Sequence, residues 1–359
     1  MVIKMLIYKN VKLNGKITDI SVEDGKIVSV QPTNDSGVDM GGRDVYPGMI
    51  DIHIHGCVGF DATSEPDHLK EMSDYLARKG TTTWYPTTST VDFDDLIKAV
   101  STDISDIPGA NIPGFHMEGP YISGKKLGVM NEKFLRLPKA EEIAPLTQVK
   151  LINVAPEIPG AMEFIENTDV VVAIGHTVAD YDTAVAAARK GAKCLTHTFN
   201  AMPPMLHRDP SLVGAALTEG MYVQVISDGV HIHPAVVLAL YKMFGSEKMV
   251  LISDCISATG LMENGTLMFG GKKAIVKDGI CRNEAGALNG GTTDLLKCVK
   301  KAIEFGIPKE DAFKMATETP AKLMGINKGV LAPGYDADFI VLDDNMDIVH
   351  SIIGGEMYI

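Results

Sequence analysis

Histidines and acids stand at the ends of several short apolar runs in this chain, in a pattern that can bind a metal ion. The residues concerned are His53, His55, Glu118, His176, His197 and Asp254. Imidazole nitrogens and carboxylate oxygens together suit zinc, iron, manganese or cobalt, and such a site needs no thiolate. The sequence therefore predicts a site for one or two divalent transition-metal ions.

The first run, IDIHIHG, carries two of these histidines. Because side chains alternate between the two faces of a strand, His53 and His55 share a face and lie about 7 Å apart along it, so both can converge on one cation. The same rule places Asp51 on that face and sends the isoleucines the other way: Ile50, Ile52 and Ile54. A lone histidine is more often a packed core residue, but a His-x-His pair at a strand end favours metal binding.

Two acids and a further histidine can act beside the ion. Glu118 precedes a Gly-Pro turn and is interpreted as a metal ligand, since an unpaired carboxylate among inward histidines would be costly. Asp254 can take a proton from a metal-bound water and later give it to a leaving nitrogen; its alternative role is a helix N-cap. His231 can polarise a carbonyl group or contact an anionic substrate.

Other polar residues nearby are expected to have structural roles. His116 shares a face with Glu118 but lies deeper, as a packed residue. His233, before a proline, can cap the next helix. The cysteines near the site are expected to be small buried packing residues: Cys57, Cys194 and Cys255.

The candidate residues follow eight apolar runs that alternate with helical patterns. The runs cover residues 49–55, 81–87, 111–117, 149–155, 170–175, 193–198, 222–227 and 249–253. Asp92 and Asp180 are expected helix N-caps, and Gly80 and Gly191 expected helix ends. Eight β/α units predict an α/β fold, a (β/α)8 TIM barrel whose functional groups gather at the carboxyl ends of its strands.

Both ends of the chain are rich in short strand patterns and differ from the middle. An Asp24-Gly25 turn predicts a hairpin near the N-terminus. We therefore expect residues 1–48 and 329–359 to form one small β-sandwich domain, and residues 49–328 to form the metal-dependent barrel. Within the latter, residues 263–288 are expected to form a hairpin-like insertion over the barrel mouth.

Composition excludes several function classes. The chain has 359 residues, 33 Lys plus Arg and 46 Asp plus Glu, for a net charge of −13, and no basic cluster that would predict nucleic-acid binding. It shows neither a signal peptide nor the 18 apolar residues of a membrane span. The five cysteines are odd in number, widely spaced and form no CxxC pair, which favours a reducing cytoplasm.

Several motifs together resemble the amidohydrolase superfamily and, within it, the N-acetylglucosamine-6-phosphate deacetylases. They are PGMIDIHIHG, HMEGPY, IGHT, THTFNAMPP, SDGVHIHP, ISDCISATG and GVLAPGYDADFIVLD, in this order from about residue 3 to residue 359. The resemblance implies a TIM barrel with a β-sandwich built from both ends. It also implies hydrolysis of the N-acetyl amide of N-acetylglucosamine 6-phosphate to glucosamine 6-phosphate and acetate, and a homodimer whose partner subunit can complete the phosphate site.

The resemblance also assigns residue roles. Glu118, His176 and His197 match the core metal ligands, and Asp254 matches the catalytic acid and base. His53 and His55 match ligands of a second metal found in some members. The sugar- and phosphate-contacting positions are matched by Asn200, Ala201, Arg208 and His231.

Three further segments bear on the substrate. Where the deacetylase branch usually has Gly-Ala-His after EGPY, this chain has Gly128, Val129 and Met130. Arg208 can bind phosphate through its forked donors or form a surface ion pair with Asp209. The segment ALNGGTTDLL is expected to place backbone N–H groups before a helix, where they can bind an anion or a sugar oxygen, or else to form a turn capped by Thr292 or Thr293. Its candidate contacts are Leu288, Asn289 and Gly290.

Two other functions stay open at this point. One is a different amidohydrolase reaction, on a cyclic amide or on another N-acylated sugar phosphate. The other is a catalytically silent barrel that serves as a binding module, although every candidate ligand position holds a competent residue.

Overall fold

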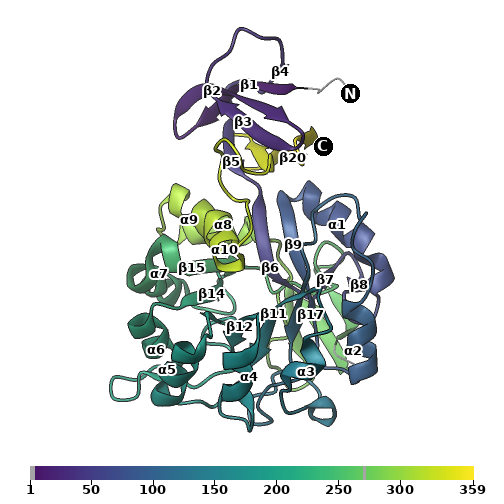
Figure 1. The fold of residues 1–359 in the computed structure, drawn as a ribbon, viewed down its shortest axis with the longest axis vertical. Coiled ribbons are helices and arrows are strands. Elements are labelled where there is room, and N and C mark those ends of the chain that lie inside the picture. The colour runs from purple at the N-terminus through teal and green to yellow at the C-terminus, as the bar shows by residue number, and fades with distance from the viewer. Residues whose placement is uncertain (1–4, 270–271) are drawn as a thin grey trace.

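A parallel barrel forms the larger part of the protein (Figure 1), whose computed structural model describes residues 5–269 and 272–359. The strands follow one another around the barrel in the order β15-β14-β13-β12-β11-β10-β9-β6. All eight predicted strands are confirmed, with these bounds: β6 Met49–Ile54, β9 Thr81–Thr88, β10 Phe115–Glu118, β11 Val149–Val154, β12 Val171–Ile174, β13 Cys194–Leu195, β14 Tyr222–Ile226 and β15 Met249–Ile252. The sixth is much shorter than expected.

The first and last strands meet through a few backbone hydrogen bonds. His55 N–H donates to the Cys255 carbonyl over 2.9 Å, and Asp254 N–H donates to the His53 carbonyl over 3.0 Å. These bonds bring the first and last strand ends together, so residues far apart in the sequence become neighbours.

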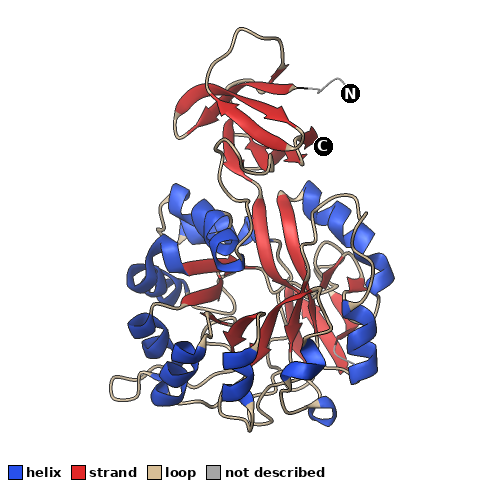
Figure 2. Ribbon diagram, viewed as in Figure 1, coloured by secondary structure: helices blue, strands red, loops and turns tan. Residues whose placement is uncertain are grey.

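Helices surround the barrel strands (Figure 2). Their bounds are α1 Leu69–Arg78, α2 Phe93–Val100, α3 Ala140–Ile143, α4 Ala161–Asn167, α5 Tyr181–Lys190, α6 Ser211–Glu219, α7 Pro234–Lys248, α8 Leu295–Glu304, α9 Lys309–Met315 and α10 Glu318–Met324, with short 3-10 turns at Pro66–His68 and Glu132–Phe134. The expected N-caps are confirmed: Asp92 accepts from Asp94 N–H, and Asp180 accepts from Thr183 N–H. His233 caps α7, as expected.

The side-chain alternation predicted for β6 is wrong in its first half. Ile50 and Ile52 pack into a buried cluster with residues of the opposite strands, such as Ala173 and Cys194, and therefore point into the barrel. The pairing of β6 with β9 shifts register between Asp51 and Ile54. This irregularity breaks the period of two, so His53 and His55 still reach the interior whereas Asp51 does not lie on their face.

Asp51 instead joins the first and last barrel strands. Its carboxylate accepts hydrogen bonds from His53 N–H at 3.1 Å and from Ser253 N–H at 3.2 Å. Burial raises its pKa to about 7, although both hydrogen bonds act to lower it. Asp51 thus helps to fix the strand ends that carry His53 and Asp254.

A second sheet combines strands from both termini, which confirms the predicted arrangement. Its strands are β1 Leu6–Leu13, β2 Lys16–Glu23, β3 Lys26–Val30, β4 Val38–Asp39, β5 Asp44–Pro47, β19 Phe339–Leu342, β20 Ile348–Ile353 and β21 Glu356–Met357. Asp24 and Gly25 both have positive φ in the two-residue turn between β2 and β3, as a primed hairpin turn requires. The expected domain bounds at residues 48 and 329 stay a prediction, and residues 1–4 lie outside the described residues.

The insertion predicted at residues 263–288 is an antiparallel sheet of three strands, β16 Gly265–Phe269, β17 Lys272–Lys277 and β18 Ile280–Asn283. Residues 270 and 271 lie outside the described residues. A further small pair joins β7 Gly56–Cys57 to β8 Phe60–Asp61.

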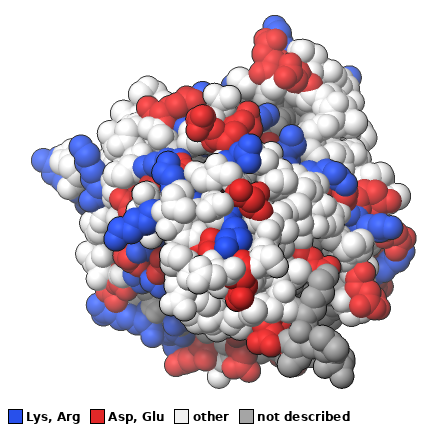
Figure 3. All heavy atoms as spheres, turned by 90° about the horizontal axis from the view of Figure 1, so that it is seen from above, with Lys and Arg blue, Asp and Glu red and all other residues white. Residues whose placement is uncertain are grey.

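Charged side chains of both signs are interspersed over the face shown in Figure 3. Across residues 5–269 and 272–359, no helix combines the length and the apolar character needed to cross a membrane.

Candidate functional site

Glu118 is the centre of a buried cluster at the carboxyl ends of the barrel strands. Its Oε1 atom lies 2.8 Å from His197 Nε2, 3.2 Å from His176 Nε2 and 3.4 Å from His53 Nε2, and its Oε2 atom lies 3.1 Å from His55 Nε2. The donor atoms form two groups that could each hold a metal ion, and Glu118 belongs to both. The structure therefore brings together all five residues expected to be metal ligands.

Unusual backbone geometry directs several of these side chains inward. His176, His197 and Asp254 have φ values of 48°, 24° and 50°, in the left-handed region that non-glycine residues seldom adopt. His176 and Asp254 stand two residues after the ends of β12 and β15. The chain thus leaves each strand by a sharp turn, and such strain is typical of functional sites.

Three histidines have their Nδ1 atoms fixed by an acceptor. The acceptors are the Lys126 carbonyl for His176 at 2.8 Å, the Thr87 carbonyl for His55 at 3.1 Å and Gln224 Oε1 for His53 at 3.2 Å. Because these oxygens only accept, each Nδ1 must carry the hydrogen. In the neutral imidazole, Nε2 then presents its lone pair.

The residues present fit a metal centre. The Nε2 atoms of His53 and His55 lie 3.4 Å apart, and those of His176 and His197 lie 3.1 Å apart. Lone pairs that face one another at these distances repel unless a proton or a cation lies between them. Nitrogen and oxygen donors in this mixture suit zinc, iron, manganese or cobalt.

Asp254 faces the same cluster from the last strand. Its Oδ1 atom lies 3.3 Å from His53 Nε2 and 3.4 Å from His55 Nε2. Burial favours the neutral acid, but in the metal-free protein the charge of protonated His53 and the hydrogen bond from protonated His55 outweigh burial and lower the Asp254 pKa to about 2. The alternative of a helix N-cap is wrong, because the next helix, α8, begins only at Leu295.

A cavity of about 220 Å³ opens onto the cluster. Its lining comprises His55, Glu118, Gly128, Val129, Met130, His176, His197, Asn200, Ala201, His231, Asp254, Phe269, Leu288 and Gly290. Phe269 comes from the insertion, and its ring packs edge-on against His55 with ring centres 5.3 Å apart. The insertion therefore covers the barrel mouth, as expected, and makes one wall of the cavity apolar.

His231 is held by an acid that sequence reasoning missed. Its Nδ1 atom lies 2.7 Å from Asp228 Oδ2, while Asp228 Oδ1 accepts from the N–H groups of Val230 and His231. Burial opposes protonation, but the hydrogen bond to Asp228 outweighs it and raises the His231 pKa. The acid three residues before the histidine was the available signal.

Most of the expected substrate contacts line the cavity, but Asn289 and Arg208 do not. The Asn289 side chain is buried, and neither atom of its amide has a partner among the described residues. Arg208 lies on an exposed segment, where its guanidinium contacts His207. In the single chain, therefore, no arginine from that segment reaches the cavity.

The expected binding of an anion or a sugar oxygen by backbone N–H groups of residues 289–291 stays a prediction for Gly290, which lines the cavity. Gly291 N–H donates to the Asp254 carbonyl over 2.7 Å, so it is not free for a ligand. The N-cap of α8 is Asp294 rather than Thr292 or Thr293. The Gly291 N–H group thus supports the Asp254 backbone.

Residues expected to be structural are buried beside the cluster. His116 packs edge-on against His53 with ring centres 4.6 Å apart, and burial lowers its pKa well below the usual histidine value. The cysteines expected to pack are buried and free: Cys57, Cys194 and Cys255.

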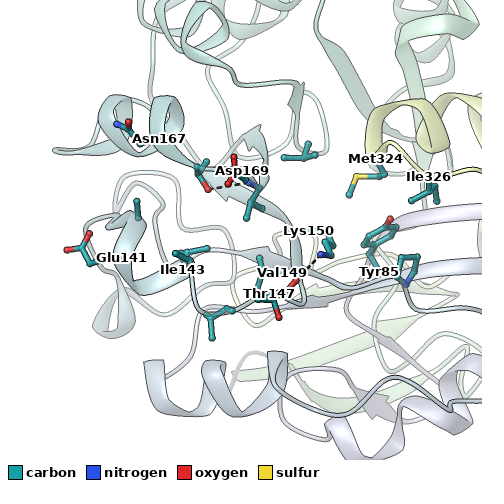
Figure 4. Close-up of a pocket in the computed structure, with 17 residues that line it drawn as sticks. Tyr85, Glu141, Ile143, Thr147, Val149, Lys150, Asn167, Asp169, Met324 and Ile326 are labelled. Atoms are coloured by element: carbon teal, nitrogen blue, oxygen red, sulfur yellow. Dashed lines mark hydrogen bonds between the residues drawn. The ribbon is translucent and has the colours of Figure 1, made fainter.

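A larger cavity, of about 670 Å³, lies at the opposite end of the barrel (Figure 4). It is lined by the starts of β11 and β12, including Val149 and Val171, and by Tyr85, Met324 and Ile326. None of the residues of the two potential metal groups lines it. The larger cavity therefore shares none of the potential metal ligands that line the smaller one.

Residues 45–358 match the model of the amidohydrolase family. The chain belongs to this family.

Individual relatives resemble this amidohydrolase over nearly its whole length. It is 33% identical to N-acetylglucosamine-6-phosphate deacetylase of Vibrio furnissii, over 96% of its own length and 88% of the relative. It is 30% identical to N-acetylgalactosamine-6-phosphate deacetylase of Escherichia coli O157:H7, over 94% of each chain. Among solved structures, N-acetylglucosamine-6-phosphate deacetylase from Pasteurella multocida superposes with a TM-score of 0.92 at 27% identity, over 99% of both chains.

Proposed function

We propose that this amidohydrolase removes the acetyl group of N-acetylglucosamine 6-phosphate by hydrolysis, giving glucosamine 6-phosphate and acetate. The observation that carries the proposal is the buried Glu118–histidine cluster with Asp254 beside it at the wall of the cavity. The deacetylases named above support the substrate class, since their likeness extends over nearly the whole chain.

Glu118, His176 and His197 would hold one metal ion, and His53, His55 and Glu118 a second. A bound divalent ion makes water a better nucleophile at neutral pH and polarises a carbonyl oxygen. Glu118 can serve both positions because its two oxygens face different histidines: Oε1 lies closest to His197, and Oε2 lies closest to His55.

Two residues act on the amide directly. Asp254 accepts a proton from the attacking water and delivers it to the sugar nitrogen, which must leave as an amine because an amide anion is too basic. His231, whose Nδ1 is bound to Asp228, directs Nε2 at the cavity and in its protonated form donates a hydrogen bond to the acetyl oxygen.

The substrate contacts would divide between sugar and phosphate. Asn200 and Ala201 would contact the sugar from one wall of the cavity, and Gly128, Val129, Met130, Leu288 and Gly290 from the others. Asn289 would support this wall from behind, since its side chain is buried. Arg208 would bind the phosphate of a substrate held by a partner subunit.

Self-association is the second part of the proposal. An apolar groove of about 490 Å³ adjoins the cavity and shares His231 with it; its lining includes Met205 and Val236, which are both partly exposed. Leu206 is exposed beside the groove and stands two residues before Arg208 in the sequence. A second copy seated here would cover this apolar face and bring Arg208 toward another cavity.

We place the enzyme in the cytoplasm because all five cysteines are buried thiols, which suits a reducing compartment.

The galactose epimer of the substrate is a second candidate. The 30% identical Escherichia coli relative is named for N-acetylgalactosamine 6-phosphate, and the two sugars differ only in the configuration of one hydroxyl group.

The deciding experiment combines metal analysis with an acetate-release assay on both phosphosugars, with a dihydropyrimidine as control substrate. We expect acetate from N-acetylglucosamine 6-phosphate, lost on chelation and restored by metal. Turnover of the cyclic amide without acetate release from either sugar would refute the proposal.

A further inference from the structure

The three histidines with a fixed Nδ1 atom differ in what fixes them. His55 and His176 donate to backbone carbonyls, of Thr87 and Lys126 respectively. His53 donates instead to a side chain, Gln224 Oε1. The orientation of His53 therefore depends on a residue that substitution can remove, whereas that of the other two depends on the backbone.

Gln224 lies inside the barrel on β14, and its side chain is fully buried. Its Nε2 atom lies 3.8 Å from Cys194 Sγ on the adjacent strand. Burial raises the Cys194 pKa to about 12, so the sulfur is a thiol and can accept a hydrogen bond only weakly.

These contacts set the direction of the amide. An amide placed the other way would turn its NH2 group toward His53 Nδ1, which would then have to become the acceptor. His53 Nε2 would carry the hydrogen in that case and could no longer bind a cation while neutral. The observed direction keeps the Nε2 lone pair toward Glu118 and His55.

We propose that Gln224 is a positioning residue for the second metal site, the one formed by His53, His55 and Glu118. This inference rests on the proposed metal-dependent function. The Gln224 side chain holds the His53 ring and its tautomer, whereas the bond from Gln224 toward the His197 segment is made by its backbone carbonyl, which accepts from Thr198 N–H over 2.8 Å and does not depend on the side chain. Its loss should therefore weaken one ion and spare the other.

Asn153 provides a matched control, because it is another fully buried amide inside the same barrel. Its Oδ1 atom accepts from Thr196 Oγ1 at 2.7 Å rather than from a candidate ligand. Replacing Asn153 removes a buried amide of the barrel interior without removing the acceptor of any of the histidines.

The experiment titrates zinc into metal-free protein under chelator competition and measures bound zinc per chain. We expect two ions in the wild type. In Gln224→Leu, one of the two ions should lose about 10- to 100-fold in affinity while the other is unchanged. Gln224→Glu keeps an acceptor and should retain both ions, as should Asn153→Ala, which adds no bulk beside Gly175.

Three results would overturn the inference. The first is unchanged binding of both ions in Gln224→Leu. The second is equal weakening of both ions, in Gln224→Leu and also in Asn153→Ala, which would indicate general loosening of the barrel. The third is a single ion in the wild type. Failure of the proposed function looks different: zinc binding would depend on Gln224 as expected, yet no acetate would be released.

Discussion

Glu118 is the residue on which the site depends most, because one side chain lies within 3.4 Å of four imidazole nitrogens. The carboxylates of Glu118 and Asp254 are buried among four imidazole nitrogens. Such a cluster is stable only when protons or cations balance the negative charges of the two carboxylates. In the metal-free protein, burial acts to raise the pKa of Glu118, but the positive charges of protonated His53 and His176 outweigh it and hold this pKa well below its ordinary value. The carboxylate is thus ready to share a cation.

Asp254→Asn tests the assignment of the proton carrier. The amide keeps the size of the carboxylate but cannot accept a proton, so we expect turnover to fall about 100- to 10,000-fold. Because Asp254 belongs to neither of the two potential groups of metal ligands, the metal content of the variant should match that of the wild type. Acetate release and metal analysis of the same preparation check both points, and loss of the ions would show instead that Asp254 is a ligand.

Asp228→Asn tests the pair beside the cavity through the pH dependence of stability. The His231 pKa is raised from 6.5, so its contribution is complete below pH 6.5 and is lost as pH rises through the raised value. The Asp228 pKa is lowered from 3.8, because hydrogen bonds from His231 outweigh burial, so its contribution is lost only as pH falls through that lower value.

We therefore expect Asp228→Asn to lower the free energy of unfolding of the metal-free protein by about 1.5–3 kcal/mol at pH 6 and by less at pH 9. Urea denaturation at both pH values measures the difference. Asp92→Asn, which removes an exposed N-cap carboxylate on α2, controls for the loss of a negative charge. An equal loss at the two pH values would mean that the pair does not carry the stabilisation.

At the scale of elements, the strand ends are packed tightly enough to hold strained turns. Gly175 follows β12 and precedes His176. A methyl group added to it would lie 2.6 Å from Thr196 Cβ and 2.7 Å from Asn153 Oδ1. Both neighbours belong to the barrel interior, so only a residue without a side chain fits between them.

Gly175→Ala should therefore cost about 1–3 kcal/mol of stability through overpacking, and it should weaken metal binding by displacing His176. Thermal unfolding and zinc titration measure the two effects. The control is Gly124→Ala, whose added methyl would meet nothing closer than 3.6 Å. If the two variants behave alike, the close packing at Gly175 does not position His176.

For the whole molecule, the metal centre connects strands that are distant in the sequence. The candidate ligands come from β6, β10 and the segments after β12 and β13. A ligand that binds only the folded state stabilises it by about 2.7 kcal/mol at a concentration 100 times its Kd. We expect chelation to lower Tm and added zinc to restore it. An unchanged Tm would show that the cluster does not bind metal in the folded protein.

Arg208→Ala tests the proposed contribution of a partner subunit. Losing a charged hydrogen-bonding group should raise KM for the phosphorylated sugar about 10- to 100-fold. Hydrolysis of unphosphorylated N-acetylglucosamine should be unaffected, because it has no phosphate to bind. Sedimentation should show a dimer for both proteins. Equal effects on the two substrates would place Arg208 outside phosphate recognition.

Local patterns in the sequence were enough to predict the fold and the cluster. Eight apolar runs alternating with helical patterns predict a parallel barrel, and a barrel brings the carboxyl ends of its strands to one rim. The same patterns predict that His53, Glu118 and His197 meet at that rim, because each residue follows or ends such a run. Hairpin patterns at both ends of the chain similarly predict the joint terminal sheet.

Strand register decides which side chains of β6 point inward, and contacts between distant strands decide the partners of the site residues. Both follow from the tertiary structure alone. The shift in β6 that turns Ile52 inward is invisible to a rule of simple alternation. Gln224 and Asp228 acquire their roles from the histidines they contact, and the Gly291 N–H group is occupied by the Asp254 carbonyl. Local patterns specify which side chains are available, whereas long-range packing decides which atoms meet.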